Sequence, residues 1–194
     1  KGLTLIGPGT IRPFTFFAVD QVSTLTIPSG QQAHFAAVDF APHPAILAVT
    51  HRVVANGRVT FEDCSFGAGA PNNLIVSGTI LLHHCLVHGS TINSGSVQVG
   101  GMRVQGGVCC ITNSTLVGAS AVFSGGYATY IVPPSPALVV QAGIVLLSTS
   151  NLFGGAGLAH PMFGAPLPGA PAVVVTNGTT SVSDCSLRGG PSPN

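Results

Sequence analysis

The stretch ALVVQAGIVLLSTSNLFGG, residues 137–155, recurs without a gap as AVVVTNGTTSVSDCSLRGG, residues 172–190. Each copy contains an apolar segment, a glycine turn, a second segment with apolar residues at alternate positions, and a final Gly-Gly. A fixed unit that recurs along a chain is typical of proteins that stack one supersecondary unit on the next. The duplication therefore predicts a β-solenoid.

Three further copies precede this pair when the turn glycines are aligned at Gly57, Gly78, Gly107, Gly143 and Gly178. Apolar residues then fill four columns, with one threonine as the exception, at three residues before the glycine and at two, four and nine after it. The columns are Val54, Ile75, Val104, Val140 and Val175; Val59, Ile80, Cys109, Val145 and Thr180; Phe61, Leu82, Ile111, Leu147 and Val182; and Phe66, Val87, Leu116, Leu152 and Leu187. The period of two predicts strands with one face inward, and frequent Gly and Pro argue against helices.

Small residues occupy the position seven after each turn glycine. They are Cys64, Cys85, Ser114, Ser150 and Cys185. Small side chains suit the tight bend between two strands of one coil, and like residues stack between neighbouring coils. The glycines that follow the last strand are expected to form corners with a left-handed backbone. They are Gly89, Gly118, Gly154 and Gly189.

One domain is expected over residues 1–194, with regular coils over 51–190 and atypical coils over 1–50. Residues 25–40 match the strand rhythm and predict one N-terminal coil, and residues 3–19 predict another. Terminal repeats are commonly atypical because they cap the core. The sequence thus predicts about six to seven coils.

Charged residues make up only 6% of the chain, against about 25% in an average globular domain, and the formal net charge is +1. This balance predicts no nucleic-acid partner, and the lack of a long apolar run predicts no membrane insertion. The chain starts at Lys1 without a signal-like segment, so we expect a processed form or a fragment. So few charges fit either a soluble secreted protein or one packed against copies of itself.

The acidic residues are too dispersed to predict a catalytic pair. Asp63 and Asp184 share one column but lie four coils apart, about 19 Å at about 4.8 Å per coil, whereas glycosidase carboxyl groups are about 5–9.5 Å apart. Glu62 and Asp63 are adjacent in an expected strand and should point to opposite faces. Asp20 and Asp39 approach each other only if the first coils stack. A cluster of Asp20, Asp39, Glu62 and Asp63 in one groove would instead favour an enzyme.

The densest polar cluster is His83, His84 and His88, with His51 expected one coil earlier and Cys85 as a further ligand candidate. Zinc needs three or four convergent ligands, and alternation along a strand should turn His83 and His84 to opposite faces. The alternative is a set of ordinary surface histidines. We assign no metal or cofactor.

The chain has five cysteines, so at least one is unpaired. Cys64 and Cys85 are the one pair in a single column on adjacent coils, which makes a disulfide geometrically conceivable. The alternative is a stack of buried thiols that pack as small apolar groups. Cys109 and Cys110 are adjacent in sequence and are not expected to bond to each other.

The spacing between turn glycines varies, which places extra residues in Pro- and Gly-rich loops at 119–136 and 156–171. These loops are expected to leave the stack at one corner. They and the adjoining strand are rich in large apolar residues, namely Phe123, Tyr127, Tyr130, Ile131, Phe153, Met162 and Phe163. The residues either fold back over the stack as a second core or form a subunit interface.

The segments Pro136–Val140 and Val182–Gly190, with weaker forms at 57–69 and 78–89, resemble the right-handed parallel β-helix repeat proteins of the pectate-lyase-like superfold. The likeness is greatest to large secreted or surface repeat proteins of environmental bacteria, and it covers about residues 50–190. The resemblance implies a right-handed parallel β-helix. Because this fold hosts lyases, hydrolases, adhesins and filaments, the resemblance implies no single activity.

Together these features predict an all-β, right-handed parallel β-helix with Pro- and Gly-rich loop insertions. The expected function is that of a non-catalytic extracellular structural protein, a self-assembling subunit of a filament, sheath or surface layer whose partners are copies of itself. The alternative is a polysaccharide-binding or polysaccharide-cleaving β-helix of the pectate-lyase type, so enzyme activity stays open. No catalytic, cofactor-binding or metal-binding residue is assigned. An ice-binding Thr and Ser face ranks lower because no regular Thr-x-Thr ladder is present.

Overall fold

The computed structural model describes residues 2–6, 14–18, 22–42, 49–67, 72–89, 101–124, 130–159 and 166–193. Within these ranges the chain is all-β and contains no helix. The strands form a ten-stranded sheet, a seven-stranded sheet and a separate two-stranded sheet. We name the ten-stranded sheet the first sheet and the seven-stranded sheet the second sheet.

The first sheet contains β1 (Gly2–Ile6), β3 (Val22–Ile27), β4 (Gln32–Ala36), β6 (Val49–Glu62), β8 (Asn72–His83), β10 (Met102–Thr112), β14 (Leu138–Val140), β15 (Ile144–Ser148), β17 (Val173–Val175) and β18 (Thr179–Ser183). The second sheet contains β2 (Phe14–Ala18), β5 (Val38–Pro42), β7 (Ser65–Phe66), β9 (Leu86–His88), β11 (Thr115–Val117), β16 (Asn151–Phe153) and β19 (Ser186–Arg188). The two-stranded sheet pairs β12 (Val122–Ser124) with β13 (Tyr130–Val132) in antiparallel orientation.

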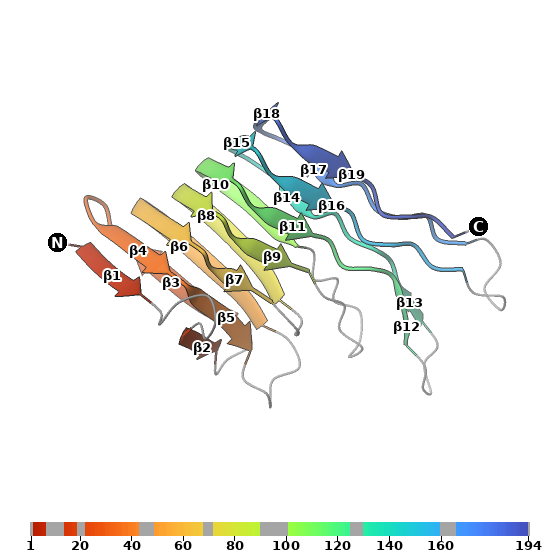
Figure 1. Cartoon of the computed structure of the whole chain (residues 1–194), viewed down its shortest axis with the longest axis horizontal. Helices are drawn as coiled ribbons and strands as arrows, with labels where there is room; N and C mark the ends of the chain where they lie inside the picture. Colours follow the sequence, from red (N-terminus) through yellow and green to blue (C-terminus); the bar gives the residue numbers. More distant parts are fainter. Residues whose placement is uncertain are drawn as a thin grey trace.

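The chain passes back and forth between the first and second sheets. It leaves a strand of the first sheet through a short corner, as from β10 to β11, and then returns one place further along the first sheet. All strand pairings within these two sheets are parallel. Figure 1 shows the colours following the sequence across the stack, with β1 at one end and β17 to β19 at the other. The predictions of an all-β chain and of parallel strands are confirmed.

The N-terminal strands follow the same order. β4 pairs with β6 and β5 pairs with β7, so residues 25–40 lie in register with the repeat that follows them. β1 and β2 precede them as the parallel partners of β4 and β5. We use "repeat" for one passage through the first sheet and then the second.

Three of the four predicted apolar columns are rows of Cα partners on neighbouring strands. The column through Phe61, Leu82, Ile111 and Leu147 joins each residue to the next, and these four side chains are at most 2% exposed. The columns two and nine residues after the turn glycine follow the same register. Their side chains form the core between the two sheets.

The fourth predicted column is wrong in two repeats. Val54 lies opposite Ser77 rather than Ile75, and the buried partner of Val104 is Val76. The cause is a change of register at the glycine turn, where β6 and β10 each carry extra residues relative to β8. Alignment on the glycine therefore misplaces the strand that precedes it.

The left-handed corners lie at a different position from the one predicted. Gly118, Gly154 and Gly189 are not among the residues of positive φ. A Cβ at Gly118 or Gly154 would instead lie 2.0 Å or 1.9 Å from a backbone oxygen of a neighbouring loop, so these glycines permit close stacking. The non-glycine residues with a left-handed backbone stand at the corner between the two sheets, with φ of 49–55°. They are Ala37, Asp63, His84, Asn113, Thr149 and Asp184.

Thr149 is the most strained of these corners, because its branched Cβ is poorly tolerated at a φ of 50°. We expect Thr149→Asn to raise the free energy of unfolding by about 1 kcal/mol, since Asn enters this region readily. Urea unfolding followed by far-UV circular dichroism measures the change. Thr115→Asn is the control: Thr115 lies in the extended strand β11, where Asn should be destabilising. Destabilisation by both substitutions would contradict the role assigned to the corner.

The two long loops leave the sheets as predicted. In the first, β12 and β13 pair only with each other among the described strands, and in the second Leu158 and Leu167 form an antiparallel bridge. Backbone hydrogen bonds such as Ala121 N to Ala156 O stack one loop on the next. Val132 and Ala119 are buried there, so the loops add a small packed layer beside the core.

Candidate functional site

Polar and titratable side chains gather on the outer face of the first sheet, where β4, β6 and β8 end. We name His34, Glu62, Asp63, His83 and His84 the histidine–carboxylate row. The residues that precede Glu62 and His83 and follow His34 are buried in the core. Alternation along the strands therefore places His34, Glu62 and His83 on the outside.

The row is held together by contacts between neighbouring repeats. His34 Nε2 lies 3.1 Å from Glu62 Oε2, and His84 Nδ1 pairs with Asp63 Oδ1. His83 Nδ1 lies 2.8 Å from the Thr112 hydroxyl. The side chain of His84 is 67% exposed, so these pairs are surface interactions that contribute at most about 1 kcal/mol each.

The expected opposite orientation of His83 and His84 is wrong. The strand β8 ends at His83, and His84 turns the corner with a φ of 55°. The two rings lie 6.4 Å apart between centroids. Asp63 stands at the same kind of corner after Glu62, so strand alternation does not apply to that pair either.

The described side chains of His83, His84 and His88 do not assemble into the zinc site that the sequence left open. No group of three or more His, Cys, Asp or Glu that suits a metal ion occurs among the residues the structure describes. Cys85 is buried in the core, and His88 is exposed on β9 of the second sheet. The side chain of His51 lies outside the described part.

The described acids are spread over both sheets. Asp63 and Asp184 stand at equivalent corners of repeats that are four steps apart, as predicted. Glu62 belongs to the first sheet and Asp39 to the second. Asp20 lies outside the described residues. Glu62 and Asp63 are adjacent, and each contacts a histidine of a neighbouring repeat.

Asp39 on β5 is half-buried, and its Oδ1 is buried without a hydrogen-bond partner among the described residues. Its Cα partners are Thr15 and Ser65 on the neighbouring strands. Burial raises the pKa of Asp39 above the usual value for an aspartate. The ionised carboxylate therefore costs stability in the folded chain.

We expect Asp39→Asn to be more stable than the wild type at pH 7 by a few tenths of a kcal/mol, a small effect because the side chain is partly solvated. A raised pKa lowers the stability of the wild type as pH rises above about 3.9, the unfolded value. The advantage of the variant should therefore vanish in acid. Urea unfolding at pH 7 and in acid measures the difference in stability between the variant and the wild type. Asp184→Asn, at an exposed position, is the control. An advantage that is equal at both pH values would contradict the assignment.

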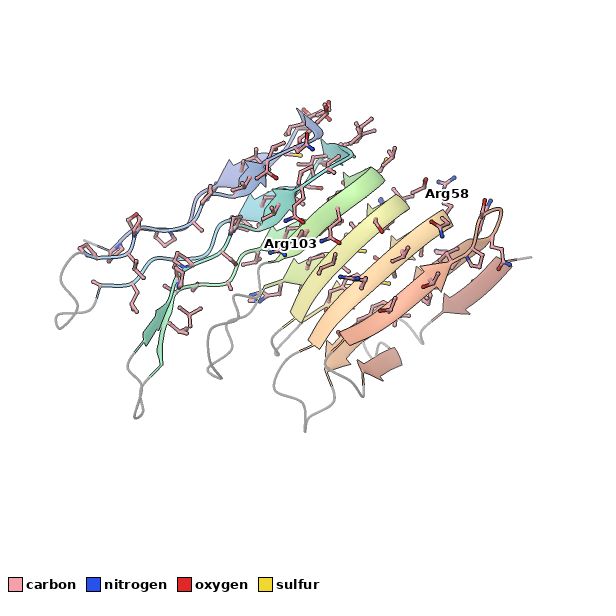
Figure 2. All side chains as sticks on the ribbon, turned by 180° about the vertical axis from the view of Figure 1, so that it is seen from behind. Arg58 and Arg103 are labelled. Carbon is pink, nitrogen blue, oxygen red and sulfur yellow. The ribbon has the colours of Figure 1, made fainter. Side chains whose placement is uncertain are left out.

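Arginines on the outer face of the first sheet were missed by the sequence analysis. Figure 2 shows Arg58 on β6 and Arg103 on β10, with β8 between these strands. Arg52 on β6 is the third arginine on this face. Arg52 and Arg103 are both Cα partners of Ile75 on β8, which lies between their strands. The Arg103 Nε is buried and has no hydrogen-bond partner among the described residues. Among the described residues, the ion pairs join histidines to Glu62 and Asp63 and do not include these arginines.

Exposed apolar side chains form two further groups, one that the sequence analysis did not single out and one that belongs to the predicted apolar columns. Val108, Ile144 and Leu146 lie on the outer face of β10 and β15. Val175, Val182 and Leu187 lie in the last repeat. The first group could have been recognised from sequence, because these residues occupy outward positions of the repeat.

The predicted apolar interface in the loops is described only in part. Phe123, Tyr130 and Ile131 lie in β12 and β13, and only the backbone of these three residues is described. Phe153 is half-buried in β16. Tyr127, Met162 and Phe163 lie outside the described residues, so this interface stays a prediction.

No protein-family model, no curated protein and no solved structure matches this chain. Among the described residues there is no helix long and apolar enough to span a membrane. The function is therefore inferred from the residues and surfaces of this chain alone.

Proposed function

We propose that the chain is a right-handed parallel β-helix that serves as a non-catalytic, extracellular structural protein and associates end to end with copies of itself. The parallel sheets, which repeat in register from β1 to β17, support a stack of coils. Asp63 and Asp184 lie four repeats apart, too far to act as one catalytic pair. Two features of the ends and the low charge of the chain support association.

The last repeat carries the proposal, because it exposes side chains whose counterparts in the repeat before it are buried. Val175, Val182 and Leu187 are 44–46% exposed. Their Cα partners one repeat earlier lie in the same columns and are at most 2% exposed. The exposed group is thus the core surface of a stack, ready to receive another layer.

The two ends of the stack are complementary in their backbone groups. Among the described strands, β17, β18 and β19 pair on one side only, and β1 and β2 stand at the opposite ends of the two sheets. All these strands run parallel, so the N-terminal edge of one copy continues the ladder of another in the same orientation. Such a head-to-tail contact does not close on itself and generates a filament.

The composition favours the same contact. Only 6% of residues are charged and the net charge is +1, so repulsion between copies is weak. Surface charge is the usual means by which soluble proteins resist association along open strand edges.

Val182→Glu tests the proposal, because a charge at the exposed end should block stacking without disturbing a packed core. We expect the wild type to form concentration-dependent linear assemblies by analytical ultracentrifugation and negative-stain microscopy, and the variant to remain monomeric with an unchanged circular dichroism spectrum. Thr179→Glu is the control: Thr179 is exposed on the same strand, in a row that faces away from the core, so assembly should persist. A wild-type chain that stays monomeric at all concentrations overturns the proposal.

A further inference from the structure

The column of small residues at the corner between the sheets is a buried hydrogen-bonded ladder. The column contains Cys64, Cys85, Ser114, Ser150 and Cys185, and the first four are at most 3% exposed. Each side chain donates to the carbonyl oxygen two residues earlier, at 2.8–3.4 Å. Serine and cysteine therefore serve equally in this position.

Neighbouring members of the column are joined by the backbone. The Cys85 amide donates to the Ser114 hydroxyl at 3.0 Å, and the Ser114 amide donates to the Ser150 hydroxyl at 3.1 Å. Each side chain thus faces the equivalent side chain of the next repeat. Within the column, Cys64 and Cys85 are the adjacent pair in which both members are thiols.

The register sets the spacing of Cys64 and Cys85. The residues that follow them, Ser65 and Leu86, are Cα partners, and the Leu86 amide donates to the Cys64 carbonyl at 2.9 Å. Adjacent strands lie about 4.7–4.9 Å apart, which falls within the about 4.4–6.8 Å that disulfides span between Cα atoms. Both side chains point into the same narrow space of the core.

We propose that Cys64 and Cys85 form a disulfide when the chain folds in the presence of a small-molecule disulfide, which gives the stack a redox-dependent cross-link between two repeats. The thiolate of one cysteine attacks the small disulfide, forms a mixed disulfide and releases one small thiol. The thiolate of the other cysteine then attacks the protein sulfur of the mixed disulfide and releases the second small thiol. The two protein thiols lose two protons and two electrons, and the small disulfide accepts both electrons.

The two sulfur atoms lie in different surroundings. Their mutual interaction lowers the pKa of Cys64, and the same interaction together with burial raises the pKa of Cys85. Cys109 differs, because burial raises its pKa and its Cα partners are Ile80 and Val145.

The reaction takes place during folding or when the core opens locally, because both sulfur atoms are buried in the folded chain. The chain is therefore unfolded in denaturant and refolded in a buffer of reduced and oxidised glutathione. Free thiols are then alkylated with iodoacetamide under denaturing conditions. Chymotryptic cleavage after Phe66 and Leu82 separates the two cysteines for mass spectrometry.

We expect the mass of the intact chain to fall by two hydrogens. The peptide map should contain a linked pair of peptides with Cys64 and Cys85, and the other three cysteines should be alkylated. The oxidised chain should also unfold at a higher urea concentration than the same sample treated with dithiothreitol. Alkylation of all five cysteines at every glutathione ratio, or a link to a different cysteine, overturns the proposal. If refolding fails, protein secreted into an oxidising compartment gives the same peptide map.

Serine substitutions provide matched controls, since serine already occupies this column. Cys64→Ser and Cys85→Ser should each abolish both the mass change and the dependence of the urea midpoint on dithiothreitol. Cys185→Ser should retain both, because Cys185 is stacked on Ser150. The disulfide does not depend on end-to-end association, so either proposal can fail without the other.

Discussion

Replacement of Gly107 by alanine is expected to lower the free energy of unfolding by about 3 kcal/mol or more, enough to unfold a marginal domain. Gly107 has a φ of +81°, where an L side chain is strained by about 1–2 kcal/mol. A Cβ at this position would also lie 2.3 Å from the carbonyl oxygen of Gly78 in the repeat below. Because the neighbouring atoms belong to the backbone, relief requires the two repeats to separate.

Two other glycines separate these contributions. Gly30 has a φ of +72° with no atom within 4 Å of an added Cβ, so Gly30→Ala should show the backbone strain alone. Gly106 has neither a positive φ nor a close neighbour, so Gly106→Ala should change the free energy of unfolding by at most about 0.5 kcal/mol. Urea unfolding by far-UV circular dichroism suits the series, since the chain lacks tryptophan. Equal losses for Gly106 and Gly107 would refute the role of stacking.

The inward columns were predictable from sequence because they depend only on the alternation within each repeat. Phe61 and Leu82 keep their places whatever the length of the loop between them, since the strand after the turn glycine has constant length. The segment before the glycine has no such anchor. Extra residues in the turns of β6 and β10 shift Val54 and Ile75 by one place, and the glycine spacing alone does not reveal them.

The polar contacts were harder to predict because they join different repeats at strand ends. Asp63 and His84 were both recognised as candidates, yet their pairing follows from the left-handed corner that ends each strand. The corner column did contain a signal, since Asp and Asn tolerate a positive φ better than most residues. Glycine after the last strand was the more familiar indication, and it reflects close stacking of loops instead.

Replacement of Phe61 by alanine should cost about 3–5 kcal/mol, because it removes the centre of an aromatic cluster in the core. The Phe61 ring stacks on Phe35 at 5.3 Å between centroids and meets Phe40 and Phe66 edge to face at 5.7 and 5.2 Å. These contacts join two consecutive repeats, and Phe61 is 1% exposed. The cavity would lie between both sheets, so neither sheet can close it by a local shift.

Two matched variants show whether the loss comes from the aromatic packing. Phe61→Leu should cost about 1–2 kcal/mol, because its Cα partner Leu82 shows that leucine fits the same column one repeat later. Thr60→Ala should change stability by at most about 0.5 kcal/mol, since Thr60 faces outward on the same strand. Urea unfolding at low protein concentration measures all three. If Phe61→Leu costs no measurable stability, the rings add nothing beyond apolar volume, and the N-terminal repeats are held only by the columns that the rest of the stack shares.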